Sequence, residues 1–190
     1  CQSALIPIVL TLLDPVSATP GSMSVCDDGS GMALFNLSDI EDNVSGGTGT
    51  VNWFSDPGGI MEIVSPDMYL SGNATIYAQV TSGTCMSSFV PVQLMILPVP
   101  QAVSVAIQEC GDANGQATID LTSYDGTISN GTGTVEWYLD MAHTQAISDP
   151  TNYLTGNSVI YAIVSNSNCT SGVVAISIDI LSTLVATVIP

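Results

Sequence analysis

The chain has 190 residues, of which 17 are acidic and none is lysine or arginine, so its formal net charge at pH 7 is −17. A chain without these basic side chains cannot neutralise nucleic-acid phosphates, is repelled by anionic membrane surfaces, and cannot form a lysine–asparagine isopeptide crosslink. Hydrophobic residues make up 46% and charged residues only 9%, so material for buried cores is ample. The charge fits either adaptation to salty water or acidic loops that bind calcium.

The N-terminal segment, residues 1–15, is largely apolar and is interrupted by Pro7. It is too short for a transmembrane helix, which needs about 20 apolar residues, and it lacks the basic start of a signal peptide. We therefore expect no membrane insertion. An offset of 84 residues places Cys1 on Cys85, so this segment is predicted to be the last strand of a preceding repeat, with Cys1 bonded to an upstream cysteine. The first cysteine of a bacterial lipoprotein is the alternative interpretation.

The same offset of 84 residues runs through the rest of the chain. Residues 26–85 align with residues 110–169 without a gap and are identical at 24 of 60 positions. The matched pairs include Cys26 and Cys110, Cys85 and Cys169, Trp53 and Trp137, and Tyr77 and Tyr161. A fixed period of this length marks an array of domain-sized units. We predict one repeat at 16–98, a second at 99–182, and the entry strand or linker of a following repeat at 183–190.

Within each repeat, short segments of strand-like alternation are separated by turns rich in glycine and proline. The predicted strands are Met32–Leu37, Thr50–Phe54, Thr75–Thr81 and Phe89–Leu97, with their counterparts Gln116–Leu121, Thr134–Tyr138, Val159–Ser165 and Val173–Leu181. Many short strands at regular spacing predict an all-β fold, here two tandem immunoglobulin-like β-sandwich repeats. We assign Trp53, Trp137, Tyr77 and Tyr161 to the cores. The alternative for the tryptophans is a surface position for glycan stacking.

The five cysteines are an odd number. With Cys1 set aside, four cysteines allow three pairings, and only Cys26–Cys85 with Cys110–Cys169 keeps each bridge within one repeat. We therefore predict these two disulfides and, through them, an oxidising extracellular setting. A zinc site is poorly supported, because no Cys-x-x-Cys is present and His143 is far from any cysteine in the sequence.

The sequence carries none of the common catalytic or nucleotide-binding motifs, such as Gly-x-Ser-x-Gly, His-Glu-x-x-His or a glycine-rich phosphate loop. We therefore expect no catalytic residues and no enzyme activity. No cofactor is predicted, and calcium is the one ion that the acidic loops could bind. The weak candidate ligands are Asp27, Asp28, Asp39, Glu41 and Asp42. They match no EF-hand pattern, so no metal site is assigned.

The second repeat combines Glu109-Cys-Gly-Asp with Gly131-Thr-Gly-Thr-Val-Glu-Trp-Tyr and ends in Val159-Ile-Tyr-Ala-Ile-Val and Cys169. The part common to both repeats, Cys followed by Gly-Thr-Gly-Thr-Val-x-Trp, Tyr and Tyr-Ala-x-Val…Cys, resembles the tandem immunoglobulin-like repeats of giant surface proteins of gliding Bacteroidetes. The resemblance covers almost the whole chain. It implies cell-surface adhesins or long extracellular fibres of many repeats, usually exported by type IX secretion.

Two hypotheses of different classes follow. In the first, the repeats are a structural segment of an extracellular surface fibre or adhesin stalk, whose partners are copies of itself in a filament and, through a distal tip, other cells or surfaces. In the second, each sandwich is an adhesin module that binds a glycan or protein through loops at one end, with Asp56–Val64 and Asp140–Ser148 as the variable loops. Neither hypothesis involves nucleic acid.

Overall fold

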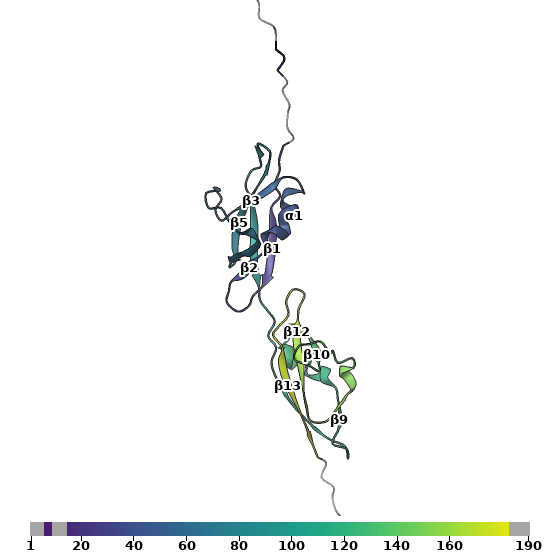
Figure 1. The fold of residues 1–190 in the computed structure, drawn as a ribbon. Helices are drawn as coiled ribbons and strands as arrows, with labels where there is room; N and C mark the ends of the chain where they lie inside the picture. The colour runs from purple at the N-terminus through teal and green to yellow at the C-terminus, as the bar shows by residue number, and fades with distance from the viewer. Residues whose placement is uncertain (1–5, 9–14, 183–190) are drawn as a thin grey trace, which may run out of the picture. The chain divides into compact units, whose positions relative to one another are not determined.

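The computed structural model describes residues 6–8 and 15–182. The chain divides into two compact units between Ile96 and Leu97, close to the predicted boundary at residue 98. The predicted strand at residues 1–15 lies mostly outside the described residues, as does the segment predicted at 183–190. Figure 1 shows the strands and short helices of both units.

The first unit is built from one large sheet and one small antiparallel sheet of two strands. The large sheet has the order β1-β7-β5-β3, with β6 added beside β5, and the small sheet pairs β2 with β4. These strands are β1 (Gly21–Cys26), β2 (Ala33–Phe35), β3 (Thr50–Phe54), β4 (Tyr69–Ser71), β5 (Ala74–Ser82), β6 (Cys85–Met86) and β7 (Val90–Leu97). Short helical turns lie between them: η1 (Leu37–Ile40), α1 (Glu41–Ser45) and η2 (Pro66–Met68).

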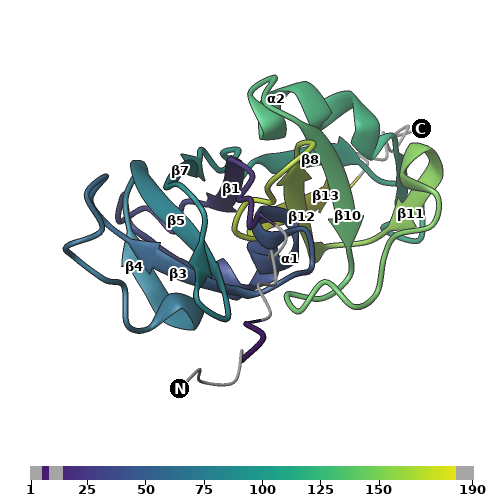
Figure 2. The same ribbon diagram turned by 90° about the horizontal axis from the view of Figure 1, so that it is seen from above.

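The second unit repeats this arrangement, with a large sheet in the order β10-β12-β13-β8 and a small sheet of β11 and β9 (Figure 2). Its strands are β8 (Ala106–Cys110), β9 (Ala117–Ile119), β10 (Thr134–Tyr138), β11 (Tyr153–Thr155), β12 (Ser158–Ser165) and β13 (Val174–Leu181). Its helical turns are η3 (Leu121–Tyr124), α2 (Asp125–Ser129) and η4 (Pro150–Asn152). The predicted fold is confirmed: each unit is an immunoglobulin-like β-sandwich.

Each core lies between the two sheets of its unit and is closed by the short helix. Trp53 and Trp137 are buried, at 2% and 4% exposure, because the two-residue period places them beside Val51 and Val135 on the inner face. Both indole N–H groups donate to a carboxylate on the short helix, Trp53 to Glu41 at 3.4 Å and Trp137 to Asp125 at 3.1 Å. The prediction that the tryptophans anchor the cores is confirmed.

The assignment of Tyr77 and Tyr161 to the core is wrong. Both are only half-buried, and neither belongs to the buried clusters. In β5 the inner face carries Ile76 and Ala78, so the alternating strand turns Tyr77 to the opposite face. Other tyrosines, Tyr69 and Tyr153, pack against the cores instead.

Candidate functional site

The first cysteine of each repeat ends a strand at the edge of the large sheet. Cys110 is the last residue of β8, which runs parallel to β13, and its register partner is Leu181 at the end of β13. The Gly111 N–H donates to the Leu181 carbonyl at 2.8 Å and holds the chain there. Cys26 likewise ends β1, which lies beside β7.

The second cysteine lies in a tight turn after the central strand of the same sheet. Cys85 pairs with Ser82 across the turn between β5 and β6. At the matching place in the second unit, the Asn166 side-chain oxygen accepts a hydrogen bond from the Cys169 N–H at 2.7 Å. The sequence Ser82-Gly-Thr-Cys85 thus uses a glycine turn, and Asn166-Ser-Asn-Cys169 uses an asparagine turn, for the same position.

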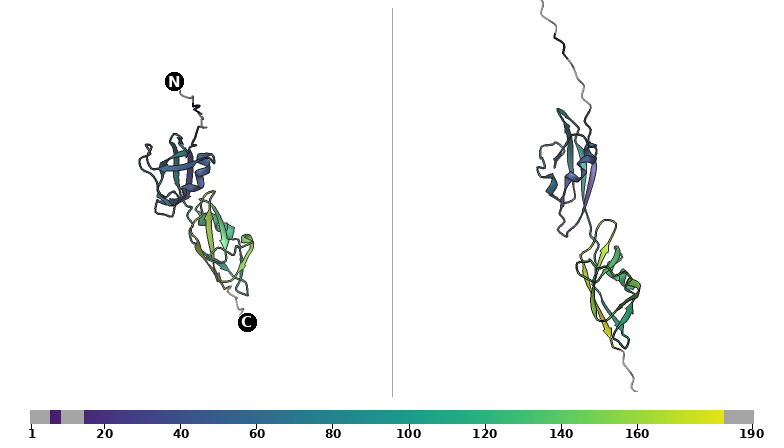
Figure 3. Two further views of the ribbon diagram at one scale, coloured as in Figure 1. Left: turned by 45° about the horizontal axis from the view of Figure 1, so that its top comes forward. Right: turned by 45° about the vertical axis from the view of Figure 1, so that its right-hand side comes forward.

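These two positions lie at opposite ends of one sandwich. In the second unit, β12 leaves its pairing with β13 at Ala162 and Val174 and runs on towards Cys169, whereas Cys110 lies beside Leu181. Val174 and Leu181 are the two ends of β13, about 23 Å apart at 3.3 Å per residue. Figure 3 shows the β12–β13 hairpin at one end of the unit and the β8–β9 loop at the other. A disulfide needs Cα atoms within about 7 Å, so the geometry excludes a bridge between Cys110 and Cys169.

The predicted disulfides Cys26–Cys85 and Cys110–Cys169 are therefore both wrong. Cys85 and Cys110 are free thiols, and Cys26 and Cys169 are each disulfide-bonded. Cys85 is partly exposed and Cys110 is exposed, whereas Cys169 is buried. The predicted bond of Cys1 lies outside the described residues.

The loop after the first cysteine is held by carboxylates that accept backbone hydrogen bonds. Asp27 accepts from Gly29 and Gly31, and Asp28 accepts from the Ser30 N–H at 2.9 Å. Hydrogen bonds from the Ser30 side chain and then its N–H lower the pKa of Asp28 below its usual value. These carboxylates are thus used in turn formation.

Asp112 holds the matching loop of the second repeat. It accepts from the N–H groups of Asn114 at 2.8 Å and Gln116 at 2.9 Å. The Gln116 hydrogen bond, followed by that of Asn114, lowers the pKa of Asp112. The loops that follow Cys26 and Cys110 therefore share one carboxylate-based design.

The remaining calcium candidates are also engaged locally. Asp39 accepts a hydrogen bond from the Asn36 amide at 2.7 Å, and Glu41 accepts from Trp53. Within residues 6–8 and 15–182, no three histidine, cysteine, aspartate or glutamate side chains come together as a metal would require. Calcium binding through Asp27, Asp28, Asp39, Glu41 or Asp42 stays a prediction.

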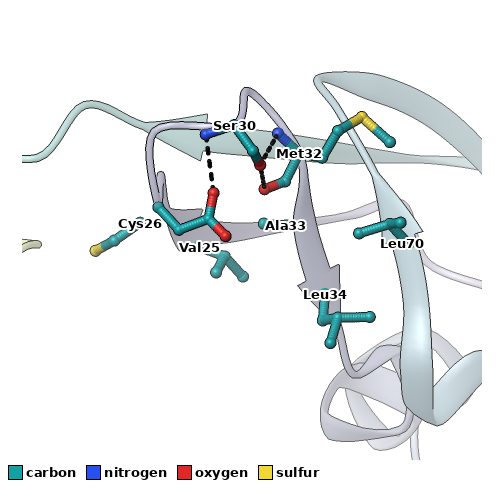
Figure 4. Close-up of a pocket in the computed structure, with 8 residues that line it drawn as sticks. Val25, Cys26, Ser30, Met32, Ala33, Leu34 and Leu70 are labelled. Atoms are coloured by element: carbon teal, nitrogen blue, oxygen red, sulfur yellow. Dashed lines mark hydrogen bonds between the residues drawn. The ribbon is translucent and has the colours of Figure 1, made fainter.

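A shallow pocket lies beside the first cysteine in both repeats. In the first repeat its volume is about 390 Å³, and Cys26, Met32, Leu34 and Leu70 contribute to its lining. Figure 4 shows the Cys26 sulfur pointing away from Leu34 and Leu70. The matching pocket of about 410 Å³ is lined by residues that include Cys110, Gln116, Thr118 and Leu154. The two pockets therefore share their position and differ in polarity, being more apolar in the first repeat.

The variable loops have the same backbone but different side chains. Isolated bridges close both loops, from Phe54 to Glu62 and from Tyr138 to Ala146. In the first repeat Phe89 packs edge-on against Phe54, with ring centroids 5.4 Å apart, over Gly59.

In the second repeat His143 stands where Gly59 stands in the first, and Val173 replaces Phe89. The His143 ring packs against Tyr138 at 5.7 Å, and its backbone has a φ of 45°. Each loop thus has one contact between two aromatic rings, but the second ring comes from Phe89 in the first repeat and from His143 in the second. Packing therefore explains why the two loops differ in sequence.

The comparison with protein families decides the assignment. The sequence model described as the Flavobacterium inter-domain disulphide bond domain matches twice, at residues 22–100 and 106–184. The chain belongs to this family. The two matches confirm the tandem organisation and the resemblance to immunoglobulin-like repeats of Bacteroidetes.

Several solved structures are similar to this chain at low sequence identity. An I-band fragment of titin aligns with 87% of this chain and 64% of its own, at 13% identity and a TM-score of 0.33. The Sidekick-1 immunoglobulin domains 1–4 align with 88% of this chain and 51% of their own, at 11% identity and a TM-score of 0.25. The chain thus spans less than two thirds of either structure. No curated protein matches it.

Across the residues that the structure describes, none of the helices has the length and apolar character needed to cross a bilayer.

Proposed function

We propose that this chain is a structural segment of a long extracellular surface fibre or adhesin stalk, in which successive sandwiches are tied together by disulfides. The observation that carries the proposal is the state of the cysteines. One cysteine of each repeat, Cys26 and Cys169, is disulfide-bonded, although the two cysteines of one repeat lie at opposite ends of the sandwich.

Elimination supports a bond between Cys26 and Cys169. Cys85 and Cys110 are free, so Cys1 is the single other cysteine in the chain. One cysteine cannot serve both bonded residues. A Cys26–Cys169 bond is also what the description of the family, an inter-domain disulphide bond domain, leads one to expect.

A bond of this kind suits a load-bearing stalk. Tandem domains joined only by a peptide linker extend when the linker or a domain yields. A second covalent connection between neighbouring domains runs in parallel with the linker, so a pulling force is shared between two paths. The same bond closes a long loop and removes conformational entropy from the unfolded chain, by about 4–5 kcal/mol in the chain-entropy account. Oxidising surroundings, as outside the cell, preserve it.

Peptide mapping without reduction tests the proposal. The free thiols are first alkylated, and the chain is then digested with pepsin, because trypsin has no site in a chain without lysine and arginine. We expect a linked peptide pair that contains Cys26 and Cys169, together with alkylated Cys85 and Cys110. In the Cys169→Ser variant, Cys26 should become alkylated as well. Recovery of a Cys26–Cys85 or Cys110–Cys169 pair would contradict the proposal.

Lateral self-assembly is the finer part of the proposed function. Only 9% of residues are charged, so neighbouring copies can pack without desolvating many charges. The outer face of the small sheet in the first repeat is apolar, with Leu34 and Leu70 exposed at 57% and 58% and Met32 at 40%. Exposed apolar patches of this kind mark contact surfaces, and we assign this one to a second copy of the chain.

Electron microscopy of the purified chain at high salt tests this assembly. We expect bundles of regular width for the natural sequence and their loss in the double variant Leu34→Ser and Leu70→Ser. The variant Leu154→Ser, which changes an exposed side chain of the second repeat, is the control and should still form bundles. Single unbundled chains from the natural sequence would contradict lateral assembly and leave the disulfide-linked stalk unaffected.

A further inference from the structure

A groove crosses the second repeat beside its variable loop, Asp140–Ser148. It consists of two hollows of about 230 and 240 Å³, which share the lining residues Ala146 and Ile147. The other lining residues come from β10, from the turn η4 and the residue before it, and from the start of β11. All of these elements belong to one sandwich, so the second repeat forms the groove by itself.

The groove combines aromatic rings with groups that form hydrogen bonds. Tyr138 lines one hollow and Tyr153 the other, and both are half-buried. Four exposed polar side chains share the lining with them, namely Glu136, Ser148, Asp149 and Asn152. A tyrosine ring has an apolar body and a polar tip, and hydroxyl and amide groups both donate and accept. Since the chain has no lysine or arginine, these residue types give a ligand no positive charge to bind.

Hydroxyl groups hold the two carboxylates of the groove in place. The Tyr138 hydroxyl donates a hydrogen bond to Glu136 Oε2 at 2.8 Å, and the Thr151 hydroxyl donates to Asp149 Oδ1 at 2.7 Å. A carboxylate has about four lone-pair sites, so each can accept further hydrogen bonds from a ligand. Both carboxylates are therefore positioned before a ligand arrives, which lowers the cost of binding one.

The first repeat has the same backbone here but different side chains. The same backbone hydrogen bond joins the loop to the tryptophan strand, at 2.9 Å in the second repeat and 2.8 Å in the first. In place of Ala146, Ser148, Asp149 and Asn152, the first repeat has Glu62, Val64, Ser65 and Met68. Because the fold forms with an exposed valine and methionine at two of these positions, it does not need the polar side chains of the second repeat. The packing of His143 does not account for them either, since that ring is not part of the groove lining.

We propose that this groove binds a neutral oligosaccharide. Sugar rings have apolar C–H faces that pack on tyrosine rings, and hydroxyl groups that donate to carboxylates and exchange hydrogen bonds with an amide. An anionic ligand is disfavoured by the two carboxylates and by the net charge of −17. A basic peptide would depend on charge attraction, which salt screens, whereas a neutral sugar would not. The second repeat thus acts as a binding module within the stalk, and this role does not depend on how the cysteines pair.

Nuclear magnetic resonance titration of the natural chain tests the proposal. The probes are cellopentaose, laminaripentaose, mannopentaose and chitopentaose, each added at about 0.5 M NaCl so that binding through charge is screened. We expect at least one probe to shift the backbone amide signals of residues 136–139 and 146–154, and to leave those of residues 52–55 and 62–70 unchanged. The absence of any shift up to about 10 mM, where even millimolar binding is detected, would overturn the proposal. So would equal shifts in both repeats.

An exchange of side chains between the repeats tests the groove itself. The variant carries Ala146→Glu, Ser148→Val, Asp149→Ser and Asn152→Met, which are the residues of the first repeat at these positions, so it should fold. We expect the active probe to bind at least about ten times more weakly, because hydrogen-bonding groups are lost and a larger side chain fills the junction of the two hollows. If the exchanged chain does not fold, Asn152→Ala at its exposed position replaces it and should weaken binding by about fivefold.

Asp179→Met is the matched control. It also introduces a residue of the first repeat, Met95, in place of an exposed carboxylate, but on β13 and outside the groove lining. This variant should bind the probe as the natural chain does. Equal binding by the natural chain, the exchanged variant and the control would place the sugar elsewhere and refute the proposal. A lysine-rich peptide that shifts the groove signals at the same salt concentration, where no saccharide does, would assign the groove to a basic partner instead.

Discussion

At the scale of single residues, the Gly-Thr-Gly-Thr-Val motif is explained by its second glycine. A Cβ on Gly133 would lie 2.5 Å from the Ser165 carbonyl oxygen, and a Cβ on Gly49 would lie 2.5 Å from that of Thr81. Both carbonyls belong to the backbone of the neighbouring strand and cannot turn aside as a side chain could. The glycine lets the strand that carries the core tryptophan approach its neighbour closely.

We predict that Gly133→Ala destabilises the second repeat by about 1–3 kcal/mol, the usual cost of forcing an extra methyl into a packed site. Gly172→Ala is the matched control, because a Cβ there meets nothing within 4 Å, and it should change stability by no more than about 1 kcal/mol. Thermal or urea unfolding of the two variants measures the difference. Equal stability of Gly133→Ala and the natural sequence would refute the close-approach explanation.

The sequence was sufficient to predict some single residues and not others. The shared offset and the two-residue period correctly placed Trp53 and Trp137 in the cores. The same period, applied to β5, excludes Tyr77 from the core, because Ile76 and Ala78 on either side occupy the inner face. Aromatic character alone therefore does not place a residue in the core. The hydrogen bonds of the indoles to Glu41 and Asp125 depend on a one-turn helix that has no detectable period.

At the scale of elements, eight of the thirteen strands were predictable, whereas β1, β4, β6, β8, β11 and the disulfides were not. Each predicted strand contains or overlaps an observed one, whereas α1 and α2, with five residues each, are too short to show a helical repeat. The cysteine pairing could not be predicted, because two cysteines that belong to one repeat need not lie close together in the folded domain. The direction of the strands determines which cysteines can pair. Because β8 runs parallel to β13, Cys110 lies at the end of β13 that is far from the turn containing Cys169.

The loop after each first cysteine gives a prediction about pH. Hydrogen bonds from Gln116 and Asn114 hold the pKa of Asp112 below its ordinary value of 3.8. A group whose pKa is lowered by folding stabilises the protein above the unfolded pKa, and this contribution is lost as the pH falls through the folded pKa. Asp112→Asn should therefore be less stable than the natural protein at neutral pH, and the difference should shrink as the pH falls below about 4.

Urea unfolding between about pH 6 and pH 2 measures this difference. Asp179→Asn removes the same charge from an exposed position of β13 and shows how much of the effect comes from net charge alone. A stability difference between Asp112→Asn and the natural protein that stays constant over the acid range, or grows, would show that the Asp112 hydrogen bonds do not stabilise the loop.

At the scale of the whole molecule, the absence of lysine and arginine from the sequence means that added salt should stabilise the fold. In most proteins, added salt weakens attractions between opposite charges as well as repulsions between like ones. Here the ionised side chains at neutral pH are carboxylates, and folding brings them closer together. Repulsion among them opposes the compact state, and screening should relieve that repulsion. A chain of this composition is therefore suited to salty surroundings.

We predict that raising NaCl from about 0.05 M to about 1 M increases the melting temperature by several degrees, since a gain of about 1 kcal/mol moves the melting point of a domain of this size by about 4–8 °C. The physical reason is the fall in Debye length from above 10 Å to about 3 Å.

The same series at about pH 2.5, where most carboxylates are protonated, is the control for effects of salt that do not depend on charge. At that pH the increase in melting temperature should be much smaller. Differential scanning calorimetry of the oxidised chain provides both measurements. An equal increase at both pH values would mean that salt acts through hydrophobic burial, and a decrease at neutral pH would mean that carboxylate repulsion does not limit the stability of this protein.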